Sequence, residues 1–204
     1  MSISNRLANH FALAAVATAA VAATSNAAIV YSGLLNIVVP ATVDGVYVNV
    51  ETGSYASSDP FPAGWDVNPY GTSTTAVSLF GATGGGYMRN PGAGTSTGRT
   101  NIAAGTNIGS ASFFYGSSTA TIGTLVGQWS ANSSGIYGFK FLAADGLTHY
   151  GWMRLSIGAN AATRTIVDYG FESTAGAAIA AGAPAPGAIA LLGLAGLATR
   201  RRRA

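Results

Sequence analysis

The sequence predicts an all-β fold: an antiparallel β-sandwich or jelly-roll-like domain, with an N-terminal signal-peptide helix and a C-terminal transmembrane helix outside it. Two observations favour this fold class. Short segments between residues 28 and 181 alternate apolar and polar side chains with the period of a strand, and no helical period competes with them. Turn signals such as Asp44-Gly45, Asn68-Pro69 and Asp145-Gly146 separate these segments.

Four alternating segments define the predicted strands. Their apolar faces are Val46, Val48 and Val50; Tyr137, Phe139 and Phe141; Met153, Leu155 and Ile157; and Val167, Tyr169 and Phe171. Asp145-Gly146 lies between the second and third segments and predicts a β-hairpin there. The glycine-rich stretch from Gly81 to Gly109 predicts long loops.

Composition and charge exclude several classes of function. Five of the ten Lys and Arg residues lie at the two ends of the chain, at Arg6 and Arg200 to Arg203. The remaining five face seven acidic residues, so the body of the protein has a net charge of −2 and carries no basic surface for nucleic acid. The chain has no cysteine, which excludes disulfides, thiolate metal sites and cysteine nucleophiles.

Residues 1–27 have the three parts of a secretory signal peptide. Arg6 lies in a short polar start, Phe11 to Ala23 form an apolar run, and Ser25-Asn26-Ala27 supplies small residues for cleavage. The run is too short for an ordinary membrane span. We therefore expect signal peptidase to cut after Ala27; the alternative is a buried Ala-rich helix.

Residues 183–204 form a second unusual segment. It contains the motif Pro184, Ala185, Pro186 and Gly187, the apolar stretch from Ala188 to Thr199, and the cluster Arg200, Arg201, Arg202 and Arg203. The prolines prevent a helix from extending into the domain. The arginines are expected to stop the apolar helix on the cytoplasmic side of a membrane, which leaves residues 28–182 outside.

This layout resembles the PEP-CTERM sorting signal of Gram-negative bacteria, although Ala185 occupies the position of the family's glutamate. The resemblance implies processing by an exosortase-like membrane protease and display at the cell surface or in the extracellular matrix, with at least transient membrane anchoring. It also implies association with exopolysaccharide and biofilm. A plain C-terminal membrane anchor without sorting is the alternative.

The residues that carry chemistry are scarce between positions 28 and 182. His149 is the single histidine there, and no Gly-x-Ser-x-Gly motif accompanies it. One histidine and no cysteine also exclude an ordinary zinc site, so we expect no catalytic residue, no metal and no cofactor. Asp66, Asn68 and Asp168 leave a calcium site open as an alternative.

Aromatic residues are the remaining candidates for ligand binding. Trp129 and Trp152 lie in alternating or buried contexts and are expected in the core, whereas Trp65 and Tyr70 lie beside loop prolines. An aromatic ring suits the C–H face of a sugar, so Trp65 and Tyr70 are candidate contacts for extracellular polysaccharide. The sequence thus predicts a non-enzymatic exported surface or matrix protein, with a displayed carbohydrate-binding module as the alternative.

Overall fold

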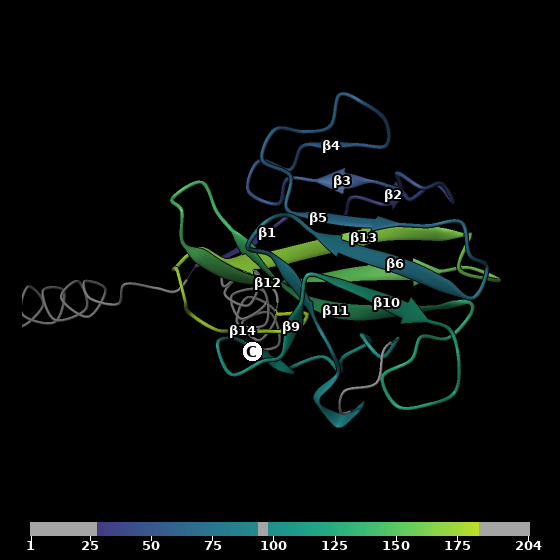
Figure 1. Ribbon diagram of the computed structural model, residues 1–204. Helices are drawn as coiled ribbons and strands as arrows, with labels where there is room; N and C mark the ends of the chain where they lie inside the picture. Colours follow the sequence, from purple (N-terminus) through teal and green to yellow (C-terminus); the bar gives the residue numbers. More distant parts are fainter. Residues whose placement is uncertain (1–27, 94–97, 184–204) are drawn as a thin grey trace, which may run out of the picture.

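The computed structural model describes residues 28–93 and 98–183, and this part of the chain is all-β (Figure 1). The antiparallel all-β prediction is confirmed there. Several predicted features lie outside the described residues: the signal peptide with Ala27, the motif Pro184, Ala185, Pro186 and Gly187, the apolar stretch, and Arg200 to Arg203. Nowhere in the two described ranges does a helix reach the length and apolarity that a bilayer crossing needs.

The described residues form fourteen strands and one 3₁₀ turn. The strands are β1 (Ile29–Tyr31), β2 (Ile37–Val38), β3 (Tyr47–Val48), β4 (Tyr55–Ala56), β5 (Val67–Tyr70), β6 (Ala76–Gly81), β7 (Gly86–Met88), β8 (Asn107–Ile108), β9 (Phe114–Tyr115), β10 (Ser117–Thr121), β11 (Ser133–Leu142), β12 (Thr148–Ile157), β13 (Arg164–Glu172) and β14 (Ile179–Ala180), and the 3₁₀ turn is η1 (Pro91–Ala93).

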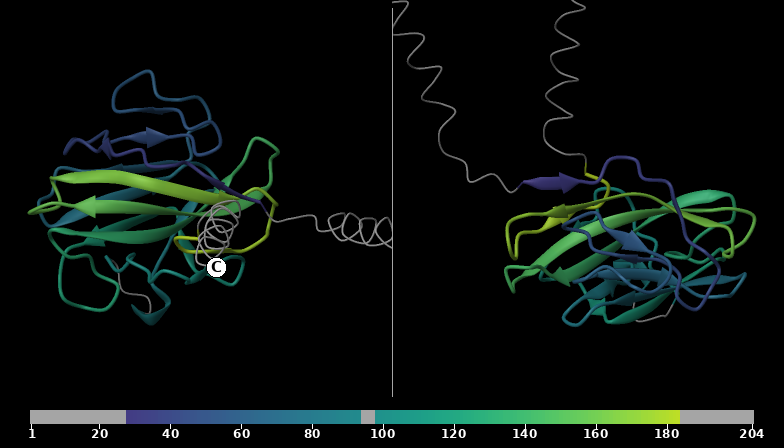
Figure 2. Two further views of the ribbon diagram at one scale, coloured as in Figure 1. Left: turned by 180° about the vertical axis from the view of Figure 1, so that it is seen from behind. Right: turned by 90° about the horizontal axis from the view of Figure 1, so that it is seen from above.

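Two large sheets pack face to face in a β-sandwich-like arrangement (Figures 1 and 2). The seven-stranded sheet has the order β1-β13-β12-β11-β7-β9, and β2 also pairs with β13. The five-stranded sheet has the order β10-β6-β5-β3-β4. A small two-stranded sheet, β14-β8, lies on the other face of the seven-stranded sheet, and all these named strands pair antiparallel.

The main hydrophobic core lies between the two large sheets. Tyr137, Phe139 and Phe141 of β11 are at most 1% exposed, as their alternation predicted. They share one cluster with Val48 and Leu79 of the five-stranded sheet. Full burial of such a side chain contributes roughly 1.5–3 kcal/mol, so this layer holds the two sheets together.

A second hydrophobic cluster covers the opposite face of the seven-stranded sheet. Trp152 and Tyr150 of β12 pack there with Ile108 of β8 and Ile179 of β14. The central strands are therefore buried on both faces, which alternation alone did not predict. The signal was present, because Tyr150 and Trp152 are large aromatic residues on the side of β12 opposite Met153, Leu155 and Ile157, and Trp152 was expected in the core.

The predicted hairpin at Asp145-Gly146 is confirmed. It joins β11 to β12, which pair without interruption from Ser133 opposite Ile157 to Leu142 opposite Thr148. Gly146 has φ = +77°, a left-handed conformation that glycine adopts without a steric penalty. β13 then pairs with β12 to complete an antiparallel meander.

The predicted face of β13 is wrong at one residue. Arg154 lies opposite Asp168, but the next pair joins Leu155 to Ile166, so β13 contains an extra residue at Val167. Such a β-bulge shifts the alternation of its strand. Ile166 consequently takes the core position beside Tyr169 and Phe171 that alternation had assigned to Val167, which is only half-buried.

The described part of the stretch from Gly81 to Gly109 includes strands where long loops were predicted. It contains β7, which pairs with β11, and β8, which pairs with β14. Tyr87 of β7 is completely buried; its hydroxyl accepts a hydrogen bond from the Asn68 amide and donates one to the Phe80 carbonyl oxygen, each at 3.0 Å. These strands could not be recognised in the sequence, because they are only three and two residues long and lie in a glycine-rich stretch.

Candidate functional site

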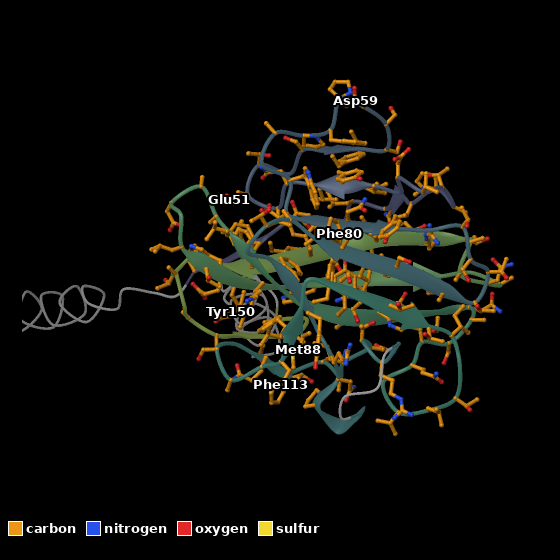
Figure 3. All side chains as sticks on the ribbon, in the orientation of Figure 1. Glu51, Asp59, Phe80, Met88, Phe113 and Tyr150 are labelled. Carbon is orange, nitrogen blue, oxygen red and sulfur yellow. The ribbon has the colours of Figure 1, made fainter. Side chains whose placement is uncertain are left out.

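The outer face of the five-stranded sheet carries an aromatic cluster, defined here as Tyr47, Phe61, Trp65 and Phe80. Tyr47 alternates with the buried Val48, so its ring points away from the core. Phe61 and Trp65 come from the connection between β4 and β5, and Phe80 comes from β6 (Figure 3). The cluster thus assembles side chains from three separate parts of the chain.

The rings of the aromatic cluster contact one another in series. The ring centroids of Tyr47 and Phe61 are 3.9 Å apart, and those of Tyr47 and Trp65 are 4.8 Å apart in an edge-to-face arrangement. Trp65 and Phe80 are 6.0 Å apart. Phe80 is 44% exposed, so the series ends in a ring that is open to solvent.

Hydroxyl groups lie beside the aromatic cluster on the same face. Strand register places Ser117 of β10 directly opposite Phe80, and Thr119 opposite Ser78 of β6. Tyr70 of β5 lies on the other side of Ser78. None of these side chains is charged, so the face combines apolar rings with neutral hydrogen-bonding groups.

The two predicted sugar contacts are not adjacent. Trp65 precedes β5 and belongs to the aromatic cluster, whereas Tyr70 ends β5 beside the hydroxyl groups. Trp65 lies two positions before the first residue of β5 and Tyr70 is its last residue, so the two side chains lie toward opposite ends of this strand. Both residues are half-buried, while Trp129 and Trp152 are at most 1% exposed, which confirms the predicted core positions of the latter pair.

Asp66 is a buried carboxyl group next to Trp65. It is 4% exposed, and its Oδ2 atom accepts a hydrogen bond of 2.8 Å from the Val50 amide. Burial raises the pKa of Asp66 to about 7; the hydrogen bond from Val50 opposes this rise, and the charge of Glu51 adds to it. The group therefore titrates near neutrality.

His149 is held by two oxygen acceptors. Its Nδ1 atom lies 2.8 Å from the Glu172 carbonyl oxygen and its Nε2 atom lies 3.1 Å from Asp145 Oδ2, and both nitrogens donate when the ring is protonated. Burial lowers the pKa of His149, but these two hydrogen bonds and the charge of Asp145 outweigh it, so the pKa is raised overall. Among the described residues no serine or threonine hydroxyl is hydrogen-bonded to this ring.

The three residues of the calcium alternative are not brought together. Asp66 and Asn68 lie at the five-stranded sheet, whereas Asp168 belongs to β13 and accepts a hydrogen bond from the Tyr31 hydroxyl. The Asn68 side-chain amide donates to the Asp44 carbonyl oxygen. In residues 28–93 and 98–183, no three His, Asp or Glu side chains are grouped so that they could hold a metal ion.

A cavity of about 330 Å³ lies in the region that was predicted as loops. Its lining includes Met88, Pro91, Phe113 and Ala178. Phe113 is 76% exposed, whereas Met88 is 3% exposed (both are labelled in Figure 3).

Comparison of the chain with protein-family models, with curated proteins and with solved structures finds no match. The function is therefore argued from the residues themselves. Sequence reasoning selected Trp65 as a candidate but did not select Tyr47, Phe61 and Phe80, which contact one another or Trp65 in the aromatic cluster.

Proposed function

We propose that the protein is an exported, non-enzymatic surface or extracellular-matrix protein of a Gram-negative bacterium. In this proposal signal peptidase removes residues 1–27, and an exosortase-like membrane protease recognises Pro184, Ala185, Pro186 and Gly187. The apolar stretch up to Arg200 to Arg203 holds the protein in the membrane at least transiently. The body, of β-sandwich or jelly-roll type, then joins the exopolysaccharide layer.

The observation that carries the proposal is the position of the packed body between the two terminal segments. β1 begins at Ile29, two residues after the expected cleavage site, and pairs with β13. At the other end Ile179 and Ala181 are each 2% exposed and close the second hydrophobic cluster just before Pro184. A body that is packed within these limits supports the assignment of export and sorting to the segments before and after it.

The test is to determine both termini of the mature protein and its location. We expect an N-terminus at Ala28 and retention in the membrane fraction or at the cell surface. A chain that stops after Ala183 should be exported but recovered in the soluble periplasmic fraction, without retention in the membrane or at the cell surface. Recovery from the cytosol of a full-length chain that keeps both terminal segments would contradict the proposal.

A second candidate function is carbohydrate binding, and the aromatic cluster favours it. Tyr47, Trp65 and Phe80 form a neutral aromatic surface with hydroxyl groups beside it, and a sugar presents both an apolar face and hydroxyl groups. Polysaccharide chains lie along exposed surfaces more readily than in closed cavities. The outer face of the five-stranded sheet therefore suits a polymer better than a small ligand.

The test is the retardation of the protein in gels that contain exopolysaccharide from the host. Trp65→Ala should weaken binding by about fivefold, equivalent to about 1 kcal/mol, because it removes a ring from the surface. Tyr70→Ala reports whether the contact extends to the hydroxyl groups. Tyr55→Ala is the matched control, since Tyr55 is 54% exposed but pairs with Val48 and points to the opposite side from Tyr47. Equal retardation of the wild type, Trp65→Ala and Tyr55→Ala variants would exclude this surface.

A further inference from the structure

A cavity of about 250 Å³ lies on the face of the seven-stranded sheet that points away from the main core. Tyr31, Trp152, Arg154 and Asp168 line it, with Leu34 and Gly182 at its edge. Strand register places the first four residues on one face, because Tyr31 and Trp152 both lie opposite Gly170 and Arg154 lies opposite Asp168. The cavity is remote in the fold from the aromatic cluster, which lies on the outer face of the other sheet.

Two aromatic rings form the apolar wall of this cavity. Tyr31 and Trp152 stack with their ring centroids 6.2 Å apart and their planes inclined by 28°. Gly170 lies between them in the sheet, and a Cβ atom there would come within 3.1 Å of the indole ring. The glycine therefore lets the two side chains approach each other across β13.

Charged and polar atoms complete the lining. The Tyr31 hydroxyl donates to Asp168 Oδ2 at 2.8 Å, and Arg154 Nη1 lies 3.4 Å from the same oxygen. Asp168 Oδ1 and Trp152 Nε1 are also buried, and neither has a hydrogen-bond partner among the described residues. A buried donor and a buried acceptor without partners are uncommon in proteins, and their cost is removed when a ligand supplies both partners.

We propose that this cavity binds a single neutral sugar residue, either free or at the end of a glycan. A sugar has adjacent hydroxyl groups, each able to donate and to accept, so one such pair would satisfy Asp168 Oδ1 and Trp152 Nε1 together. The apolar face of the sugar ring would lie against Tyr31, which is the exposed ring of the pair. The volume is below the usual range for drug-sized ligands, which agrees with one ring rather than a polymer.

The charges of the cavity also favour a neutral ligand. Arg154 and Asp168 form an ion pair, so the lining as a whole is close to neutral. A cationic ligand would meet Arg154, and an anionic ligand would meet the buried carboxylate of Asp168. Neither a cationic nor an anionic ligand would find a group of opposite charge that is not already part of the ion pair.

The experiment follows the three indole N–H signals of the full chain by NMR during titration with glucose, galactose and mannose. A zwitterionic detergent keeps the apolar segments in solution without a competing sugar headgroup. We expect the Trp152 signal to shift with a dissociation constant in the millimolar range, as is usual for so small a ligand. The Trp129 signal should stay unchanged, because its Nε1 atom donates to Thr100 Oγ1 in the core.

Two variants test the polar lining without disturbing the core. Tyr31→Phe removes the hydroxyl that orients Asp168, and Arg154→Gln removes its charged partner; the two residues are 37% and about one-third exposed. Each should weaken sugar binding by roughly five- to tenfold. Trp65→Ala should leave the Trp152 titration unchanged, which separates this site from glycan binding on the aromatic cluster.

Three results would overturn the proposal. The first is a Trp152 signal that none of the three sugars moves. The second is an equal shift in the wild type and in both variants. The third is a Trp152 response to tetramethylammonium or acetate in place of the neutral sugars, since it would assign the cavity to a charged ligand.

Discussion

Arg164 is a buried cation that is held by backbone carbonyl oxygens. It is 2% exposed, and it donates to Ala161 at 2.9 Å, to Pro40 at 2.9 Å and to Gly71 at 2.6 Å. These acceptors belong to three separate connections of the sandwich. Burial lowers the pKa of Arg164, but an arginine stays charged at any pH that the fold tolerates.

Replacement of Arg164 tests this arrangement. Arg164→Met leaves the three carbonyl oxygens without a donor and should lower the free energy of unfolding by about 3 kcal/mol or more. Arg164→Lys should recover only part of the loss, because one ammonium group cannot reach all three acceptors in the same geometry. Urea unfolding measures the free energy of unfolding of both variants. Lys140→Met, at a half-buried cation, is the control, and an Arg164→Met variant as stable as this control would refute the argument.

Asp66 makes stability depend on pH. Its pKa is about 7 in the folded protein and 3.8 ordinarily, so between these values the folded state keeps a proton that the unfolded chain has released. This contribution is fully present at low pH and is lost as pH rises through 7. We expect the wild type to lose roughly 2–4 kcal/mol between pH 4 and pH 8 from this group.

Asp66→Asn isolates the effect of that carboxyl group, because the amide keeps an oxygen for the Val50 amide but does not ionise. The variant should be the more stable protein at pH 8, as measured by urea unfolding. A small slope of the same sign should remain, since the raised pKa of His149 also gives stability that is lost as pH rises. Equal slopes in the wild type and Asp66→Asn would contradict the assignment.

The elements depend on glycines where neighbouring strands carry large rings. Gly151 of β12 lies between Phe139 and Phe171 in the sheet. A Cβ atom at Gly151 would overlap the Phe139 ring and come within 2.9 Å of the Gly170 carbonyl oxygen. The position therefore has room for a hydrogen atom only.

Gly151→Ala should lower the free energy of unfolding by roughly 1–3 kcal/mol, because overpacking forces the ring or the strand to move. Gly116→Ala is the matched control, since a Cβ atom there meets nothing within 4 Å. It should change stability by about 0.5 kcal/mol or less. Thermal unfolding followed by circular dichroism distinguishes the two, and equal melting temperatures would contradict the packing argument.

Some elements could be predicted from sequence because their signal is local. In β11 the aromatic residues at every second position are buried, and Asp145-Gly146 forms the expected turn. The bulge in β13 could not be predicted, since it depends on the register against β12 and not on the residues around Val167. The short β7 and β8 are likewise defined by the strands with which they pair.

The whole body of the protein depends on its last strand. Ile179 of β14 is 2% exposed in the second hydrophobic cluster, and β14 pairs with β8. Among the described residues, Ala181 is the last member of that cluster. We therefore expect the stability of the body to change sharply when the chain is shortened past β14.

Two truncations test the limits of the body. A chain of residues 28–183 should melt within about 3 °C of the mature protein, whereas residues 28–176 should be destabilised by roughly 2–5 kcal/mol through loss of buried Ile179 and its strand. Thermal unfolding measures both. Equal melting of the two truncated chains would show that β14 is dispensable.

The residues of the aromatic cluster and of the cavity beside Trp152 could be predicted from the sequence only in part. Trp65 could be selected from sequence because it lies in a proline-rich connection. Its partners Tyr47 and Phe80 could not, since they come from strands that meet only in the folded sheet. Trp152 was expected to be buried, which is correct, but its indole also lines a cavity with Tyr31.

The sequence by itself determined the all-β class, the core faces of β11 and β12, the hairpin between them and the low charge of the body. The strand faces and the hairpin depend on residues that are two to four positions apart, so local patterns suffice for them, and the low charge follows from composition. Only the tertiary structure decided that the seven-stranded sheet is covered on both faces and that Tyr31 meets Asp168 across 137 positions. The physical reason is that strand order and register, which no local pattern encodes, select the side chains that become neighbours.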